Sequence, residues 1–273
     1  MNPPPPRGSA WQAPAKLTVS LRVIGVRDDG YHLLDSEMVT LDLADTLEID
    51  PSGTPGLEVV PAWPDGADGW RDLSLGAPAD NLVTRALAAS GRTARVRLVK
   101  RIPPGAGLGG GSADAAAVLR WAGCTDTAVA AGLGADVPFC LTGGRASVTG
   151  IGDVVTTLPD EERTYLLVLP PFGVDTGTVY AAWDRMAADG TLPPAGHATN
   201  DLEAPALSVE PRLIDWKRAL EDVTGREARL AGSGSTWFVE GADEPEGAAG
   251  TSWLTVGGRR APLVSTRTSP ALR

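Results

Sequence analysis

Five glycines fall within the seven residues from Gly105 to Gly111, and a run of good helix formers follows them directly. Glycine has no Cβ, so a backbone rich in it can adopt positive φ angles and approach an anion closely. The first turn of the helix behind such a loop has unpaired N–H groups and a partial positive charge. The sequence therefore predicts a strand, an anion-binding glycine loop and a helix, in that order.

A flexible turn is the plain alternative for a glycine run, and two known phosphate-binding loops offer others. A Walker A loop closes with Gly-Lys-Ser or Gly-Lys-Thr, and no lysine follows the glycines here. Gly105, Gly107 and Gly110 match the spacing G-x-G-x-x-G, but a dinucleotide site also needs an acidic residue after a second strand, about 20 residues on. Asp126 has nearly that spacing yet follows a helix and a turn. Neither loop fits the segment well.

Hydrophobic periodicity predicts the elements around this loop. Up to the loop, the pattern predicts strands over 17–23, 39–49 and 94–100, a helix over 81–90, and mainly loop over 51–78. After it come a helix from Ser112, a hairpin over 145–158, a buried strand over 165–169 and a helix over 176–189. A further helix has Pro211 in its first turn and ends at Gly225; strands then flank 231–236, and Gly257–Gly258 joins a final pair. Residues 159–162 are the predicted seam between two α+β halves.

Composition excludes several classes of function. The formal net charge of -10 argues against a general nucleic-acid binder, although backbone N–H groups can still hold phosphates in an acidic protein. Two cysteines and two widely spaced histidines predict neither a disulfide framework nor a protein-held metal site. The chain lacks an apolar stretch near the roughly 20 residues that span a bilayer, and lacks a secretory signal. We therefore expect a cytoplasmic protein without a membrane partner, with a disordered proline-rich tail over 1–12.

Three segments resemble the signature motifs of the GHMP kinase superfamily, in the order that the superfamily has them. They are PAKLTVSL at 14–21, PPGAGLGGGSADAAA at 103–117 and AGSGST at 231–236. The resemblance implies a two-domain α+β GHMP kinase fold, with domains over 13–158 and 163–273 and the active site in the cleft between them. It implies ATP, with Mg²⁺ held mainly through the phosphates. The implied nucleotide-binding residues are Pro103, Pro104, Gly105, Ala106, Gly107, Leu108, Gly109, Gly110, Gly111, Ser112 and Ala113.

Segments between these motifs resemble one family within the superfamily, the 4-diphosphocytidyl-2-C-methyl-D-erythritol kinases. They are DGYH at 29–32, DNLVTRA at 80–86, GADVPFC at 134–140, GGRASVTGIGD at 143–153 and NDLE at 200–203. The resemblance covers roughly Pro14 to Glu240. It implies ATP-dependent phosphorylation of the 2-hydroxyl of a cytidine diphosphate alcohol, in isoprenoid precursor biosynthesis by the non-mevalonate route.

The resemblance also implies two catalytic residues. Asp136 matches the base that takes the proton of the attacking hydroxyl, and Lys16 matches a cation that keeps this carboxylate ionised and offsets charge on the transferred group. Taken alone, an aspartate in a loop is more often a helix or turn cap, and a lysine on a strand is usually only solvated.

Four further residues are implied at the acceptor substrate. Tyr31 and Tyr180 match rings that stack on the two faces of the cytosine, His32 would hydrogen-bond the base edge, and Thr176 lies one helical turn before Tyr180. Core packing of the tyrosines and helix capping by Thr176 are the structural alternatives. For Asn81, a nucleotide contact is a weaker suggestion.

The chain departs from the family pattern in two places. Thr18 stands where the family usually has Asn, and the segment Val118–Leu133 is shorter by about two or three helical turns. These departures keep two alternatives open, a GHMP kinase acting on another alcohol and a nucleotide-binding homologue that has lost activity. Oligomeric state, and the residues beyond Glu240, have no pattern that predicts a role.

Overall fold

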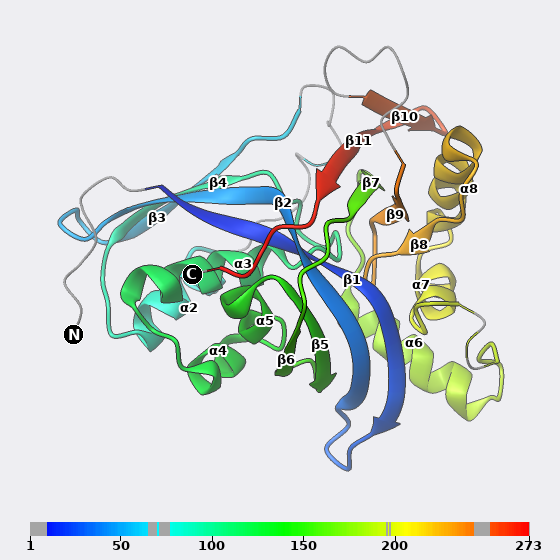
Figure 1. The fold of residues 1–273 in the computed structure, drawn as a ribbon, viewed down its shortest axis with the longest axis horizontal. Coiled ribbons are helices and arrows are strands. Elements are labelled where there is room, and N and C mark those ends of the chain that lie inside the picture. The colour runs from blue at the N-terminus through cyan, green and yellow to red at the C-terminus, as the bar shows by residue number, and fades with distance from the viewer. Residues whose placement is uncertain are drawn as a thin grey trace.

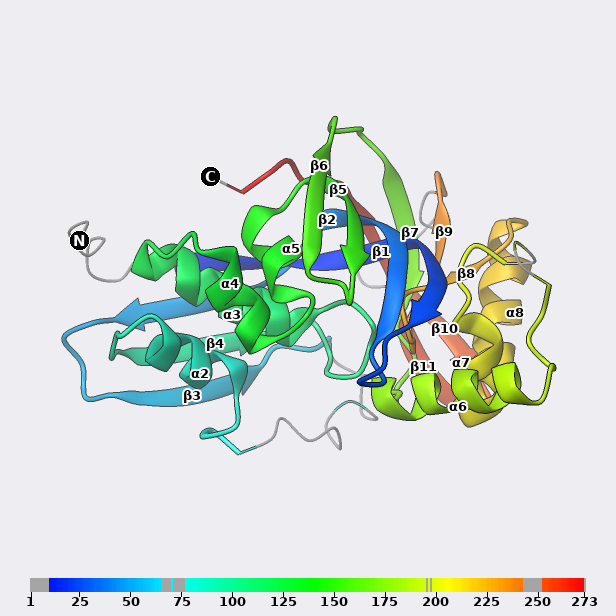
Figure 2. The ribbon, with the colours of Figure 1, turned by 90° about the horizontal axis from the view of Figure 1, so that it is seen from below.

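The structure is a computed structural model that describes residues 10–64, 70, 77–194, 196, 198–242 and 252–272. It contains two β-sheets, each with helices packed against it (Figures 1 and 2), so the predicted α+β class is confirmed. Residues 1–9 of the predicted tail lie outside the described ranges, and the first strand already begins at Ala10. Within those ranges, every helix is too short or too polar to cross a bilayer.

The first sheet is built around one long strand, β2 (His32–Asp50). It pairs along nearly its whole length with β1 (Ala10–Val26), while its two halves pair with β5 (Arg145–Gly150) and β4 (Arg95–Lys100). β3 (Gly56–Pro61) and β6 (Val154–Leu158) complete the order β3-β4-β2-β5-β6. The predicted hairpin at 145–158 is confirmed as the pair β5–β6.

Strand β3 lies inside the segment that the sequence predicts as mainly loop, and that prediction is wrong for residues 56–61. β3 runs parallel to β4, with Leu57 and Val59 packed against the apolar core of this half. Its short alternation is flanked by glycines and prolines that hide it in the sequence, and a proline at its end is tolerated because β3 is an edge strand.

Four helices belong to the first half: α2 (Leu82–Ala89), α3 (Gly110–Ala122), α4 (Thr127–Leu133) and α5 (Val137–Thr142). α3 and α5 lie against the strands, and α2 and α4 pack mainly on the other helices. The helix predicted over 81–90 is confirmed, and Asn81 is its N-cap, accepting a hydrogen bond from the Val83 N–H at 2.9 Å. α3 begins at Gly110, two residues before the predicted start. Its alanines at 113 and 115–117 are fully buried, which lets this helix lie close to the strands.

The second sheet has the order β10-β11-β7-β9-β8 and is antiparallel throughout. Its strands are β7 (Thr164–Val168), β8 (Arg229–Leu230), β9 (Trp237–Glu240), β10 (Ser252–Val256) and β11 (Arg259–Arg267). The helices α6 (Thr176–Ala188), α7 (Glu203–Val209) and α8 (Leu213–Thr224) belong to this half. α8 begins two residues after Pro211, so the prediction of a first-turn proline there is wrong.

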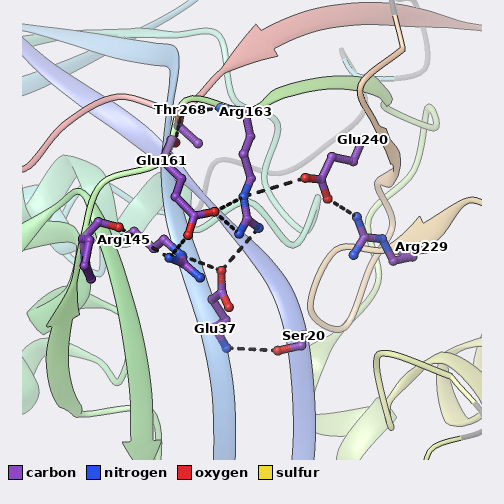
Figure 3. A network of polar contacts seen from close by, with 9 residues as sticks. Ser20, Glu37, Arg145, Glu161, Arg163, Arg229, Glu240 and Thr268 are labelled. Carbon is purple, nitrogen blue, oxygen red and sulfur yellow. Dashed lines mark hydrogen bonds and ion pairs between the residues drawn. The ribbon is translucent and has the colours of Figure 1, made fainter.

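The chain changes sheet between β6 and β7, at the predicted seam. A third apolar cluster that includes Leu17, Leu41, Tyr165 and Phe238 joins strands of both sheets. Beside it, the ion-pair network of Figure 3 crosses the seam. In this network Glu37 of β2 accepts from Arg145 Nε at 2.8 Å and lies 3.4 Å from Arg163 Nη1.

Segment 159–163 is the centre of that network. Glu161 contacts Arg145 on one side and Arg163 on the other, and Arg163 Nε lies 3.7 Å from Glu240 of β9. Single surface ion pairs contribute about 0–1 kcal/mol each. Here the pairs share members, so together they hold this segment in one orientation between the two sheets.

Candidate active site

The glycine loop is the point where three distant segments of the chain meet. The backbone N–H of Lys16 in β1 donates to the Leu108 carbonyl at 3.0 Å. From the turn between β8 and β9, the N–H groups of Ser235 and Thr236 donate to the carbonyls of Gly105 and Ala106 at 3.1 and 3.2 Å. The three motifs identified in the sequence are therefore joined by main-chain hydrogen bonds.

Two glycines of the loop are required by these close approaches. Gly107 has a φ of 77°, and a Cβ there would lie 2.1 Å from the Ala231 carbonyl oxygen. Gly109 has a φ of 65°, and a Cβ there would lie 2.7 Å from Cγ of Lys16. The loop is a fixed structure that only glycine allows at these positions, which excludes the alternative of a flexible turn.

A cavity of about 470 Å³ opens along this loop. Every residue from Pro103 to Ser112 lines it, together with Lys16, Asp136, Thr176 and Tyr180. Ala113 does not line it, because its side chain packs in the core of the first half. The cavity thus contains most of the predicted nucleotide-binding residues and both predicted catalytic residues.

Lys16 and Asp136 form an ion pair in the cavity, with Nζ 3.3 Å from Oδ2. Asp136 stands at the N-cap of α5, yet its side chain makes no capping hydrogen bond, so the capping alternative is wrong. Lys16 is only 6% exposed, so the alternative of a solvated strand lysine is wrong as well. Its ammonium also donates to Thr18 Oγ1 at 3.0 Å, so the residue that departs from the family pattern contacts the lysine directly.

An aromatic group lies beside this ion pair. The His32 ring is 4.6 Å from the Tyr180 ring and 5.3 Å from the Trp183 ring, measured between centroids, and its Nε2 lies 2.8 Å from Asp184 Oδ1. Burial raises the pKa of Tyr180, and the Asp136 carboxylate raises it further, so the phenol that lines the cavity is neutral.

Tyr31 does not join this group. It lies on the turn between β1 and β2, is 58% exposed, and has the Arg27 guanidinium 5.9 Å from its ring centroid. The structure therefore brings the rings of His32 and Tyr180 together, but of His32, Tyr180 and Tyr31 only Tyr180 lines the cavity.

A buried charge cluster that was not predicted from the sequence lies at the cavity wall, which Lys100 and Asp114 line. Lys100 Nζ contacts the Asp45 carboxylate and donates to Asp114 Oδ2 at 2.8 Å, and all three residues are at most 5% exposed. The signal was present, because Lys100 follows Val96 and Leu98 on the inward face of β4. A lysine in that register must find a buried counter-charge.

The cluster has a charge imbalance. Burial raises the pKa of Asp114 to about 7, because desolvation outweighs the attraction of Lys100. Burial lowers the pKa of Lys100, but the carboxylates of Asp114 and Asp45 raise it by more, so the net shift is upward. Asp45 also accepts from the Ile102 N–H at 2.9 Å, which ties the cluster to the start of the glycine loop.

Thr176 lines the cavity at the start of α6 without capping that helix. The cap is Asp175, whose Oδ1 accepts from the Thr178 N–H at 2.8 Å, so the capping alternative for Thr176 is wrong. The Thr176 hydroxyl instead lies 2.8 Å from that of Ser233, in the turn of the third motif. Ser233 also lines the cavity and was not among the predicted site residues.

Comparison with known proteins assigns the class first. The profile of the GHMP kinases N-terminal domain matches residues 81–144, which include the glycine loop and Asp136, and so defines a small-molecule kinase. Curated 4-diphosphocytidyl-2-C-methyl-D-erythritol kinases are 41% identical in Paracoccus denitrificans (83% of this chain, 84% of the relative) and 38% identical in Ruegeria pomeroyi (83% and 86%). A crystal structure of 4-(cytidine 5'-diphospho)-2C-methyl-D-erythritol kinase aligns with a TM-score of 0.62 and 32% identity, over 84% of this chain and 89% of the other. The chain belongs to the family of 4-diphosphocytidyl-2-C-methyl-D-erythritol kinases.

Proposed function

We propose that this protein transfers the γ-phosphate of ATP to the 2-hydroxyl of 4-diphosphocytidyl-2-C-methyl-D-erythritol, in the non-mevalonate route to isoprenoid precursors. As a GHMP kinase it is an ATP-dependent phosphotransferase that acts on an alcohol. The observation that supports this substrate best is a single cavity lined by the glycine loop, the Lys16–Asp136 pair and Tyr180.

In this proposal Asp136 is the general base and Lys16 is its partner. Asp136 takes the proton of the acceptor hydroxyl while the new O–P bond forms and ADP leaves. Lys16 pairs with the carboxylate at 3.3 Å and offers a remaining N–H donor to the charge that develops on the transferred group. Phosphoryl transfer depends mostly on positioning and charge stabilisation, so this small set of groups is chemically sufficient.

The loop offers what a nucleoside triphosphate and its Mg²⁺ need. The N–H groups at the start of α3, a helix of 13 residues, and the Ser112 hydroxyl lie along the cavity wall. Among the described residues no group of three acidic, histidine or cysteine side chains could hold a metal. The Ser112 hydroxyl is an oxygen donor, and it fits a Mg²⁺ that is bound mainly by phosphates, with Ser112 as a protein ligand. When bound there, the ion would neutralise part of the charge of the phosphates.

Replacement of Gly107 tests the loop. Gly107→Ala should lower the unfolding free energy by about 2 kcal/mol or more, because a Cβ meets the Ala231 carbonyl oxygen at 2.1 Å in a left-handed conformation. Relief of this clash moves the loop, so affinity for a non-hydrolysable ATP analogue should fall as well. Urea denaturation and calorimetric titration measure both effects. Gly132→Ala is the control, since a Cβ there meets nothing within 4 Å; a similar loss in that variant would contradict the expectation.

At the acceptor end, Tyr180 is proposed to stack on the cytosine and His32 to hydrogen-bond its edge. Tyr180→Ala should raise KM for the cytidine substrate roughly tenfold and leave KM for ATP nearly unchanged, because stacking contributes about 1–3 kcal/mol per base. Tyr180→Phe keeps the ring and should keep both KM values. The same steady-state assay on Tyr31→Ala decides whether Tyr31, from its exposed turn, forms the second face. Equal rises of both KM values in Tyr180→Ala would contradict the assignment.

A substrate panel tests the function as a whole. Purified protein should release ADP with the cytidine substrate and not with mevalonate or homoserine. Turnover of another alcohol alone would favour a different GHMP kinase, and ATP binding without any turnover would favour a homologue that has lost activity. A location in the cytoplasm, expected from the sequence, belongs to this proposal, and cell fractionation tests it.

A further inference from the structure

Residues 268–272, here called the crossing segment, follow β11 and run from the second half of the molecule back over the first (the end of the red trace in Figure 1). The Thr268 N–H donates to the Arg163 carbonyl at 2.9 Å, beside the ion-pair network of Figure 3. One residue later, the Ser269 N–H donates to the Thr40 carbonyl of β2 at 2.8 Å. The crossing segment is therefore bonded to both halves through main-chain atoms.

The far part of the crossing segment lies against the turn that ends α5. The Leu272 N–H donates to the carbonyl of Thr142, the last residue of α5, at 3.1 Å, and Ala271 forms an isolated β-bridge with Gly143. Gly143 has a φ of 67°, and a Cβ there would lie 2.9 Å from the Leu272 nitrogen. A side chain at residue 143 would push the segment away, so this contact requires glycine.

Helix α5 carries the proposed general base at its other end. Asp136 is the N-cap, and the helix has six residues, so its two ends are only about 9 Å apart. The side chain of Asp136 makes no capping hydrogen bond, and its carboxylate pairs with Lys16 of β1 across 3.3 Å. A shift of the Thr142 end would tilt so short a helix and change the distance between this carboxylate and the lysine.

The middle of α5 is held by the first half. The Arg120 guanidinium of α3 donates to the Cys140 carbonyl at 2.7 Å and to the Gln12 carbonyl of β1 at 2.9 Å. Val137 and Phe139 are fully buried in the apolar core of the same half. To these contacts the crossing segment adds one from the second half, at the C-terminal end of the helix.

We propose that the crossing segment is a positioning element for Asp136, which holds the C-terminal end of α5 and thereby sets the carboxylate against Lys16. This inference rests on the proposed function, in which Asp136 is the base and Tyr180, in the second half, stacks on the acceptor. None of the residues 268–272 lines the cavity, so the segment acts through α5 and touches neither substrate. It ties the base to the half that binds the acceptor.

Proline substitution tests the segment, because proline has no N–H to donate. Leu272→Pro removes the bond to Thr142, and Ser269→Pro removes the bond to Thr40. In steady-state assays with ATP and the cytidine substrate, each should lower kcat about tenfold, within the roughly 10²-fold that a misplacement of about 1 Å can cause. Both KM values should stay nearly unchanged. Leu272→Ala and Ser269→Ala keep the N–H groups and should keep most of kcat.

A double variant separates positioning from a general structural role. If the segment acts through Asp136, adding Leu272→Pro to Asp136→Asn should lower kcat no further, because the carboxylate that it positions is already gone. A segment that only stabilises the fold would lower kcat by the same factor in both backgrounds. Thermal unfolding of each variant shows that folded protein is compared.

Three results would overturn the inference. Wild-type kcat in both proline variants would show that the segment does not position the base. An equal effect of Leu272→Pro with and without Asp136→Asn, or loss of the folded state in both proline variants, would assign the segment to stability alone. If Asp136→Asn itself retained kcat, the proposed mechanism would be wrong, and this inference would be wrong with it.

Discussion

Asp136→Asn is expected to lower kcat by about 10²–10⁴-fold, the range that a positioned general base supplies. The amide has nearly the same size as the carboxylate but cannot accept the proton of the acceptor hydroxyl. Affinity for ATP should change little, because the nucleotide is proposed to contact the glycine loop and not this side chain. Single-turnover kinetics and titration with an ATP analogue separate the two quantities.

Asp126→Asn is the matched control for that substitution. Asp126 is also an N-cap aspartate, and it does accept a capping hydrogen bond, from the Ala128 N–H at 2.8 Å. Asparagine caps a helix nearly as well, so this variant should keep both kcat and stability. If Asp136→Asn retained kcat within a few-fold of wild type, Asp136 would not be the base.

Lys100→Met is expected to destabilise the fold by about 3–5 kcal/mol, the effect of removing one partner from a buried ion pair. It leaves the carboxylates of Asp45 and Asp114 facing each other without a cation. This is a large part of the roughly 5–15 kcal/mol that stabilises a typical domain. Equilibrium urea denaturation measures the change, and the double variant Lys100→Met/Asp114→Asn should recover part of it. A loss below about 1 kcal/mol would show that water or structural rearrangement relieves the charge.

Unlike Lys100→Met, the substitution Asp114→Asn should raise the unfolding free energy at neutral and higher pH. The pKa of Asp114 is raised to about 7 in the folded protein from its ordinary value of 3.8, so the folded state binds this proton more tightly than the unfolded state. The contribution of Asp114 to the unfolding free energy therefore falls as pH rises from about 4 to 7 and stays low above that. Asp114→Asn should gain stability relative to wild type across this window, measured as the difference between two urea titrations at each pH. A difference that does not change with pH would contradict the shift.

The glycine loop and the helix that follows it could largely be predicted from the sequence, because the residues that specify them are neighbours in the chain. Glycines at 105–111 followed by alanines specify a tight loop and a helix within a few residues. The predicted hairpin 145–158 and the helix 176–189 are confirmed for the same reason. Helix α3 begins at Gly110 and helix α8 at Leu213, each two residues away from the predicted start. They differ because capping and fraying of the first turn set where a helix begins.

Other features depend on partners far away in sequence. Strand β3 exists because β4, more than thirty residues later, supplies its hydrogen bonds. The carboxylates that meet Lys100 come from β2 and α3, and Ser233 meets Thr176 only after α6 packs on the second sheet. The exposed position of Tyr31 follows from the shape of the β1–β2 turn. Periodicity carries no information about such pairs.

The contacts that join Lys16, the glycine loop and the turn at 231–236 run through main-chain atoms and glycines. A graft that exchanges only one of these segments with a distant kinase would shift the other two, even if every side chain of the recipient were retained. Insertions are tolerated best where such contacts are absent, at the exposed turns. An engineered change of acceptor specificity therefore requires that the three segments be transferred together. The alternative is to confine the substitutions to α6.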